Sequence, residues 1–215
     1  MDRRLHRRLP RRHTTGCRNS YIFVLLYHTM EIYLIRHTTP AISRGTCYGF
    51  ADLDVAPSFQ EEAARISTIL PDTRSFDIYT SPLQRCARLA THLFGETVTR
   101  DARLKELNFG DWEMKTWDSL GENALQAWMD NYVYARVPGG ESYHDLYLRS
   151  IECFNEIVGK NSDAIIVAHS GVIRAILAYA TNTPLDKSFD IRVEYGRTAH
   201  LKIKEGKTEV VSINN

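Results

Sequence analysis

The strongest constraint on the fold is a run of five apolar residues, Ala164–Ala168 (AIIVA), in which no polar position alternates. A strand with one face in water alternates polar and apolar residues, whereas strands of a parallel sheet are covered by helices on both faces and are continuously apolar. The run therefore predicts a strand that is buried on both faces, inside a largely parallel sheet.

Segments with strand and helix patterns alternate around this run. Apolar, β-prone residues predict strands at Ile32–Ile35, Phe76–Tyr79, Ala199–Ile203 and Thr208–Ile213. Helical spacing predicts helices at Gln60–Leu70, Pro82–Phe94, Glu122–Val133, Tyr143–Val158 and Val172–Ala180. Alternating strands and helices with a buried strand predict an α/β fold, a three-layer α/β/α sandwich with a mostly parallel central sheet.

The charge is distributed unevenly along the 215 residues. Residues 1–29 contain seven arginines and a single acid, so that residues 30–215 have a net charge of about −5 although the whole chain has +1. An acidic body argues against a nucleic-acid-binding surface. No stretch approaches the roughly 18–20 apolar residues that a membrane span needs. We therefore expect neither a nucleic acid nor a membrane as a partner.

The first 29 residues differ from the rest of the chain. Their Arg-rich start and short apolar run Tyr21–Tyr27 resemble a signal peptide, but no A-x-A cleavage pattern follows. The first clear strand begins at Met30. We expect residues 1–29 to be an extension outside a single domain at 30–215; a basic tail that binds an acidic partner is the alternative.

The four cysteines, Cys17, Cys47, Cys86 and Cys153, are far apart in the sequence. A zinc site would need closer pairs, and a chain of this length without a convincing secretory signal does not need a disulfide framework. We expect reduced thiols, a cytoplasmic location and no bound metal or cofactor. The sequence does not determine the oligomeric state.

Reactive side chains follow the predicted strands where each strand ends. Arg36 and His37 end the first strand, Arg85 lies shortly after the second, and His169 follows Ala164–Ala168 directly. Ligands of such sheets bind beyond the carboxyl ends of the strands. Glu106 is the acid that we expect to join this group.

This set of side chains suits phosphoryl transfer without a metal. Two guanidinium groups can clamp a phosphoryl group, and a neutral imidazole is a competent nucleophile when its other nitrogen is fixed by a hydrogen bond. A carboxylic acid can protonate the leaving oxygen and then activate water. Taken singly, each residue has an ordinary structural role, such as a surface ion pair or a buried core histidine, but their coincidence at one sheet edge favours an active site.

The same motifs resemble a known family. Leu34–His37 (LIRH), Ser81–Arg85 (SPLQR) and Ala168-His169 occur in the order found in the histidine phosphatase superfamily, which includes the cofactor-dependent phosphoglycerate mutases. Within it, several blocks are similar to the α-ribazole phosphatases: Gly45–Gly49 with Asp52, Leu104–Glu113, Trp117-Asp118 and Pro138–Ser142. The resemblance spans about residues 31–203 and implies a phosphoglycerate mutase-like fold.

The resemblance implies a role for each matching residue. His37 would be the nucleophile that forms phosphohistidine, and Glu106 the proton donor and later the general base. Arg36, Arg85 and His169 would bind the phosphoryl oxygens. Further substrate contacts are expected from Thr38, Thr39, Ser43, Tyr48, Gly49, Ser170 and Gly171, the last two at a helix start with free N–H groups.

The substrate implied by this branch is a phosphomonoester of cobalamin synthesis, α-ribazole 5′-phosphate or adenosylcobalamin 5′-phosphate. The chain departs from the family pattern at Thr38–Pro40, where Gly-Glu-Thr is usual, at Ser43 in place of Asn, and at Met114 in place of Gly. Pro40 removes one backbone donor. The alternatives are a broad sugar-phosphate or nucleotide phosphatase and, in a different class, a non-catalytic protein that binds phosphorylated ligands.

Overall fold

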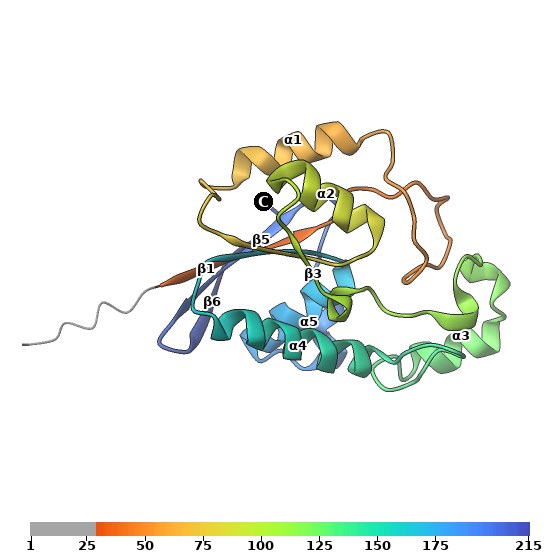
Figure 1. Ribbon diagram of the computed structural model, residues 1–215. Coiled ribbons are helices and arrows are strands. Elements are labelled where there is room, and N and C mark those ends of the chain that lie inside the picture. Colours follow the sequence, from red (N-terminus) through yellow and green to blue (C-terminus); the bar gives the residue numbers. More distant parts are fainter. Residues whose placement is uncertain (1–28) are drawn as a thin grey trace, which may run out of the picture.

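The computed structural model describes residues 29–215, so the expected extension lies, apart from Thr29, outside the described residues. A single sheet lies between two layers of helices (Figure 1). The strands are β1 (Met30–Arg36), β2 (Asp77–Thr80), β3 (Thr99–Arg100), β4 (Ala164–Ala168), β5 (Thr198–Lys204) and β6 (Lys207–Ile213). The α-helices are α1 (Phe59–Ile69), α2 (Gln84–Phe94), α3 (Glu122–Met129), α4 (Tyr143–Gly159) and α5 (Ser170–Thr181).

The strand order across the sheet is β3-β2-β4-β1-β5-β6. The four strands from β3 to β1 are parallel neighbours, and β5 runs antiparallel to both β1 and β6. Every residue of β4 is buried, and β4 lies between two parallel strands. The predicted three-layer fold with a mostly parallel sheet is therefore confirmed.

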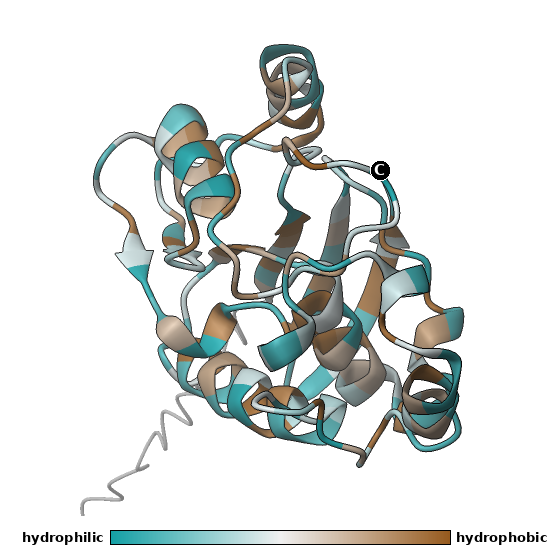
Figure 2. Ribbon diagram, turned by 90° about the vertical axis from the view of Figure 1, so that its right-hand side faces the viewer, coloured by the Kyte–Doolittle hydropathy of each residue, from teal (hydrophilic) through white to brown (hydrophobic). Residues whose placement is uncertain are grey.

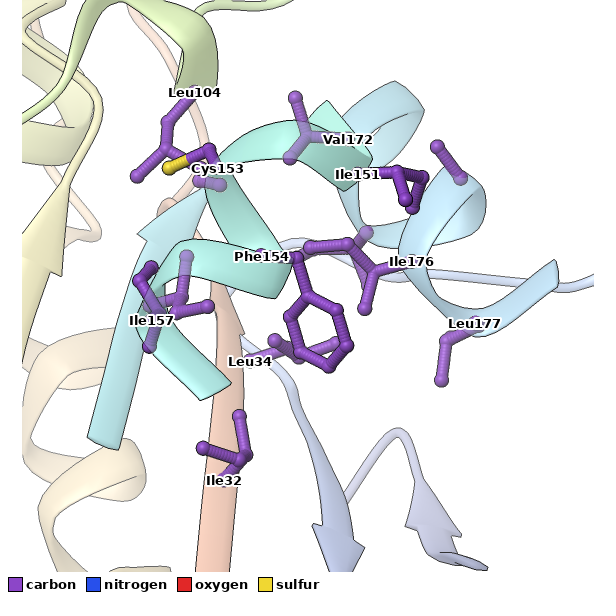
Figure 3. Packing of buried hydrophobic residues seen from close by; sticks show 14 of the residues in the cluster. Ile32, Leu34, Leu104, Ile151, Cys153, Phe154, Ile157, Val172, Ile176 and Leu177 are labelled. Carbon is purple, nitrogen blue, oxygen red and sulfur yellow. The ribbon is translucent and has the colours of Figure 1, made fainter. Parts of the chain in front are cut away.

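Each face of the sheet is covered by a separate hydrophobic cluster. Ile35, Ile165 and Val167 pack on one face against apolar residues of α1 and α2. On the other face, Ile32 and Leu34 pack against α4 and α5 (Figure 3). Burying a Leu or Ile side chain stabilises a fold by roughly 1.5–3 kcal/mol, so the two clusters fix both helical layers on the sheet. Figure 2 shows the apolar strands enclosed by helices whose outer faces are hydrophilic.

The strand register brings the predicted motifs to one edge of the sheet. Arg36 of β1 pairs with Ala168 of β4, and Thr80 of β2 pairs with Val167. The residues that follow these strands therefore leave the sheet side by side. The expected convergence of the first, second and buried strands at one edge is confirmed.

Several element boundaries differ from the sequence-based expectation. Helix α2 begins at Gln84, two residues after Pro82, because Ser81 to Leu83 form an extended turn between β2 and the helix. Helix α3 ends at Met129 rather than at Val133, and the next residues form turns. The two-residue strand β3 was not predicted, since so short a segment has no periodic pattern.

The long segment between Leu107 and Ser142 packs through aromatic side chains. Trp112, Trp117 and Trp128 contact one another with ring centroids 5.9–6.5 Å apart, and Phe109 packs edge-on against Trp117 and Trp128. This cluster holds the segment beside the sheet edge where the motifs converge. Within residues 29–215, no helix is long and apolar enough to span a membrane.

Candidate active site

His37 lies directly after β1 and is 1% exposed. Its Nδ1 lies 2.7 Å from the backbone oxygen of Thr38, so that Nδ1–H donates to this carbonyl. This hydrogen bond leaves the lone pair on Nε2. Burial and the charges of Arg85 and Arg36 hold the pKa of His37 well below its ordinary value of 6.5. The ring is therefore neutral near pH 7, the form that a nucleophile requires.

Arg85 lies in the first turn of α2 and is fully buried. Its Nη1 donates to the backbone oxygen of Ala51 at 2.8 Å, and its Nη2 donates to the backbone oxygen of Gly49 at 2.7 Å. A guanidinium has five N–H groups in a rigid fork, so these two bonds orient the group and leave other donors for a ligand.

Arg36 is the last residue of β1 and is half-buried. Its Nη1 donates to the backbone oxygen of Val193 at 2.5 Å, and its guanidinium carbon lies 3.5 Å from the centre of the Tyr195 ring. The hydroxyl of Tyr195 shares a hydrogen bond with that of Tyr48. The two tyrosines and one carbonyl thus fix the orientation of this cation.

Three buried donors around His37 are unused among the described residues. The Nε of Arg36, the Nε of Arg85 and the Oγ1 of Thr38 are buried and have no hydrogen-bond partner within residues 29–215. Leaving a buried donor unsatisfied costs about 1–3 kcal/mol, and three of the seven such atoms in residues 29–215 belong to Arg36, Thr38 and Arg85. Two cations and a hydroxyl with free donors next to a neutral imidazole suit a tetrahedral oxyanion.

His169 follows β4 and is fully buried next to His37, with the two ring centroids 5.1 Å apart. Its Nε2 lies 2.8 Å from the Oγ of Ser81 and 3.4 Å from the Sγ of Cys86. Burial and the nearby charge of Arg85 lower the pKa of His169 well below 6.5. The second imidazole is therefore also neutral and can act only as a hydrogen-bonding group.

Glu106 reaches the site from the segment after β3, where its carboxylate accepts three hydrogen bonds. Leu107 N–H donates to Oε1 at 3.0 Å, while Gly171 N–H and Ser170 Oγ donate to Oε2 at 3.1 and 3.2 Å. A Cβ at position 171 would lie 2.3 Å from Oε1, so only glycine allows this approach. The start of α5 thus positions the carboxylate.

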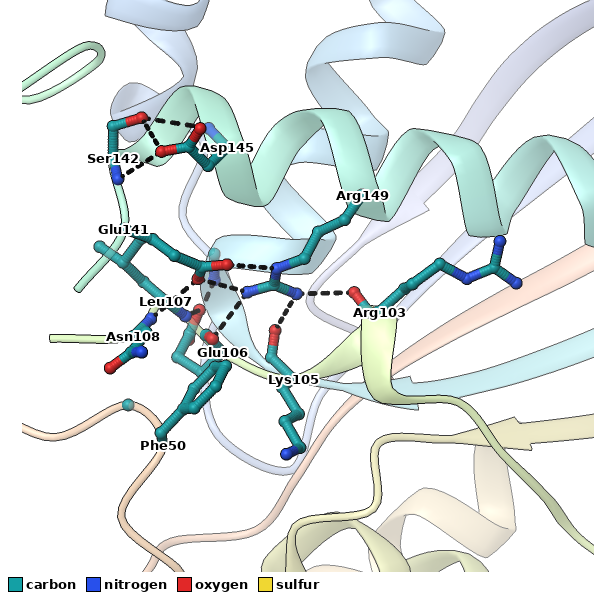
Figure 4. Close-up of polar contacts among 12 residues, drawn as sticks. Phe50, Arg103, Lys105, Glu106, Leu107, Asn108, Glu141, Ser142, Asp145 and Arg149 are labelled. Atoms are coloured by element: carbon teal, nitrogen blue, oxygen red, sulfur yellow. Dashed lines mark hydrogen bonds and ion pairs between the residues drawn. The ribbon is translucent and has the colours of Figure 1, made fainter. Parts of the chain in front are cut away.

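Arg149 of α4 holds the backbone on which Glu106 lies (Figure 4). Its Nη1 donates to the backbone oxygens of Arg103 and Lys105, both at 2.6 Å, and its Nη2 donates to that of Glu106 at 2.8 Å. An ion pair with Glu141 at 2.9 Å orients the guanidinium. Glu106 is therefore fixed from both its side chain and its backbone.

A cavity of about 200 Å³ opens beside Arg36, His37 and Glu106. Its lining residues are Arg36, His37, Thr46, Tyr48, Glu106, Leu107, Phe109, Trp117, Tyr143, Ser170, Gly171, Arg174 and Phe189. A larger and more open hollow of about 680 Å³ lies along α2, and none of its lining residues belongs to this cluster. Of the reactive side chains, Arg36, His37 and Glu106 line the smaller cavity, whereas Arg85, His169 and Thr38 do not.

The other residues expected to bind substrate occupy different positions. Tyr48 lines the cavity. Thr39 donates its backbone N–H to Glu62 of α1 at 2.9 Å. Gly49 packs so closely on the Leu107 carbonyl that a Cβ would lie 1.7 Å from that oxygen. Ser43 is exposed and does not line the cavity.

Sequence reasoning missed most of the cavity wall. Thr46, Leu107, Phe109, Trp117, Tyr143, Arg174 and Phe189 line the cavity but were not named as site residues. One signal was available: Arg174 is four residues after Ser170 in a predicted helix, and residues four apart share a helix face. Phe109 and Trp117 gave no comparable signal, because their position depends on the path of the segment between Leu107 and Ser142.

Among the described residues, no group of three or more His, Cys, Asp or Glu side chains is arranged to hold a metal ion. Cys47, Cys86 and Cys153 are free and buried. The cavity is lined by nitrogen donors, hydroxyl groups, one carboxylate and apolar or aromatic side chains.

A comparison with known families identifies this arrangement. The model of the histidine phosphatase superfamily (branch 1) matches residues 32–215. The chain belongs to this superfamily. Several relatives within it are named as phosphatases, and the chain is a phosphatase that acts on small phosphorylated substrates.

The relatives of the chain within the superfamily act on different substrates. The chain is 29% identical over 172 residues to glucosyl-3-phosphoglycerate phosphatase of Mycolicibacterium vanbaalenii, covering 73% of this chain and 76% of the relative. It is 26% identical over 196 residues to adenosylcobalamin/alpha-ribazole phosphatase of Salmonella typhimurium, covering 86% and 96%. The α-ribazole phosphatase structure from Shigella flexneri superposes with a TM-score of 0.80 at 24% identity, covering 86% and 96%, which shows the fold alone.

Proposed function

We propose that this histidine phosphatase hydrolyses phosphomonoesters through a phosphohistidine at His37. The Nε2 lone pair of His37 attacks phosphorus while Arg36, Arg85 and His169 hold the phosphoryl oxygens. Glu106, in its protonated form, gives its proton to the leaving oxygen as the P–O bond breaks. The alcohol then departs and the phosphoryl group stays on the imidazole.

The second half of the reaction reverses these roles. Glu106, now a carboxylate, takes a proton from a water molecule that attacks the phosphohistidine. The N–P bond breaks, inorganic phosphate forms, and the lone pair returns to Nε2. Glu106 is again protonated at the end of the cycle, so no external acid or base is consumed.

The observation that supports this proposal best is the set of unused buried donors beside a neutral imidazole. The free Nε groups of Arg36 and Arg85 and the hydroxyl of Thr38 offer three donors. A non-catalytic ligand-binding protein would use these donors but would not need a buried nucleophile with a fixed tautomer, nor a carboxyl group held by three hydrogen bonds. Catalysis explains all of these features together.

For the substrate, we propose a phosphomonoester of cobalamin synthesis, α-ribazole 5′-phosphate or adenosylcobalamin 5′-phosphate. The relatives of that name and the aromatic wall of Phe109, Trp117, Tyr143 and Phe189 support it, because flat heteroaromatic rings pack well on aromatic side chains. A phosphatase for acid-bearing substrates is the second candidate, since a glucosyl-3-phosphoglycerate phosphatase is similarly related. A broad sugar-phosphate or nucleotide phosphatase remains the wider alternative.

Steady-state hydrolysis with EDTA present tests the proposed reaction. The wild type should release p-nitrophenol from p-nitrophenyl phosphate, and His37→Ala should abolish this release. His92→Ala is the matched control, because His92 is an exposed histidine of α2 outside the site. Activity that survives in His37→Ala would overturn the mechanism. Equal kcat/KM values for α-ribazole 5′-phosphate and simple sugar phosphates would overturn the cobalamin assignment.

We also propose that the catalytic domain is residues 30–215, because β1 begins at Met30 and the family match begins at residue 32. A chain that starts at Met30 should keep the full kcat/KM of the 215-residue protein. A large loss of activity on truncation would assign residues 1–29 to the domain. The cytoplasmic location stays a prediction from the cysteine spacing.

A further inference from the structure

One cation of the cavity has no part in the mechanism above. Arg174 lies on α5, four residues after Ser170, and lines the same cavity as His37 and Glu106. Its Nε donates to the backbone oxygen of Ile191 at 3.0 Å, and its guanidinium carbon lies 5.1 Å from the centre of the Phe189 ring. These two contacts fix the stem and the plane of the guanidinium.

The outer end of Arg174 is unused. Neither Nη1 nor Nη2 has a hydrogen-bond partner among residues 29–215, and Arg174 forms no ion pair with any described acid. By contrast, Arg149 on α4 is paired with Glu141. Arg174 is half-buried; burial lowers its pKa, while the charge of Glu106 raises it. Glu106 acts on Arg174 without forming an ion pair with it, so the free end of the guanidinium can pair with a ligand anion.

The charged groups of the site set the charge that a bound substrate would balance. Before proton transfer Glu106 must carry its proton, and both histidines are neutral. The three guanidinium groups of Arg36, Arg85 and Arg174 then add up to three positive charges. A phosphomonoester dianion balances two of them. An anion on the leaving group would balance the third.

We propose that Arg174 is a specificity-determining residue that binds an anionic group, a carboxylate or a second phosphate, on the leaving alcohol. This inference rests on the proposed function and narrows its substrate class. Among substrates that carry a carboxylate, this role of Arg174 favours phosphate esters that resemble phosphoglycerate. Among the cobalamin intermediates, it favours adenosylcobalamin 5′-phosphate, whose nucleotide carries a phosphodiester, over α-ribazole 5′-phosphate, whose leaving nucleoside is neutral. The planar fork of arginine suits both kinds of oxyanion.

Two matched substrate pairs test the proposal and separate the two sources of the anion. 3-Phosphoglycerate and glycerol 3-phosphate differ in that a carboxylate replaces a hydroxymethyl group. Adenosylcobalamin 5′-phosphate and α-ribazole 5′-phosphate differ in the phosphodiester and its attached corrinoid. In at least one pair, the wild type should prefer the anionic member in kcat/KM. Arg174→Gln should reduce this preference roughly 10- to 100-fold, the usual effect of losing charge-assisted hydrogen bonds, with no change for the neutral member.

Two control variants separate this role of Arg174 from a general effect of charge near the cavity. Arg174→Lys should keep part of the preference, and Arg192→Gln, which removes an exposed charge next to Ile191, should keep all of it. A wild type without preference in either pair would overturn the inference. An equal loss on both members of a pair would also overturn it, because Arg174 would then serve the phosphoryl group or the fold. Absence of p-nitrophenyl phosphate hydrolysis in the wild type would instead overturn the proposed function.

Discussion

The approach of Glu106 to the start of α5 allows a quantitative prediction for Gly171→Ala. The new Cβ would lie 2.3 Å from Oε1 of Glu106, whereas ordinary contacts begin at 3.4 Å, so the carboxyl group must move by about 1 Å. The Leu146 side chain, 3.2 Å from the new Cβ, blocks part of the alternative movement. A displacement of about 1 Å at a catalytic group can cost about 100-fold in rate.

This loss should depend on the leaving group, which makes the prediction specific. Alkyl phosphates need the proton of Glu106, so their kcat should fall about 100-fold in Gly171→Ala. p-Nitrophenyl phosphate has a good leaving group that departs without protonation, so its kcat should change much less. The assay is steady-state hydrolysis across a series of phosphomonoesters of increasing leaving-group pKa, with log kcat plotted against that pKa.

Gly159→Ala is the matched control, because Gly159 also lies in a helix but has nothing within 4 Å of an added Cβ. It should leave the whole series unchanged. If Gly171→Ala slows good and poor leaving groups equally, the glycine does not act through the acid. If it slows neither, catalysis does not need the carboxyl group at its position against α5.

Four further predictions follow from the same site. Glu106→Gln should slow poor leaving groups far more than good ones in the same series, and equal slowing would remove Glu106 from the acid role. Arg85→Lys should lower kcat/KM by 100-fold or more, because lysine lacks the planar fork of arginine. Arg88→Lys, on the exposed side of α2, should leave kcat/KM unchanged, and comparable losses in the two variants would show that Arg85 is no phosphoryl clamp. The pKa values of His37 and His169 are lowered in the folded state, so the free energy of unfolding should fall as the pH drops below about 6.5. The fall should reach up to about 1.4 kcal/mol per pH unit for each histidine when unfolding is measured in denaturant. A constant free energy of unfolding down to pH 5 would contradict the burial of both rings in neutral form. Hydrolysis of p-nitrophenyl phosphate should be equal with and without EDTA, and an enzyme that needs Mg²⁺ after chelation would contradict the protein-only clamp.

The sequence predicted the parts of this molecule whose signals are local. The apolar run Ala164–Ala168 is unambiguous because a strand buried on both faces has no polar positions, and it became the central strand β4. The rule that parallel strands end at one edge predicted that His37 and His169 lie at the same rim, and the pairing of β1 with β4 makes them neighbours. Their ring centroids lie 5.1 Å apart.

The remaining features depend on tertiary contacts that no local pattern encodes. Arg149 is 43 residues away from Glu106 in the sequence, yet it holds the backbone of that residue. Leu107, Phe109 and Trp117 of the cavity wall come from the segment between Leu107 and Ser142, whose path is set by packing among tryptophans. Ser43, which stands where the family has Asn, is exposed and does not line the cavity, and its contact with substrate stays a prediction.

The central claim is that the phosphoryl group passes through the imidazole of residue 37, and a rapid quench of the enzyme with substrate tests it most directly. Mass spectrometry of the quenched protein, kept in base because phosphohistidine is labile in acid, should find one added phosphoryl group on the peptide that contains His37. The same experiment with His37→Ala should find none. A phosphoryl group on any other residue, or turnover without a phosphorylated intermediate, would contradict the account.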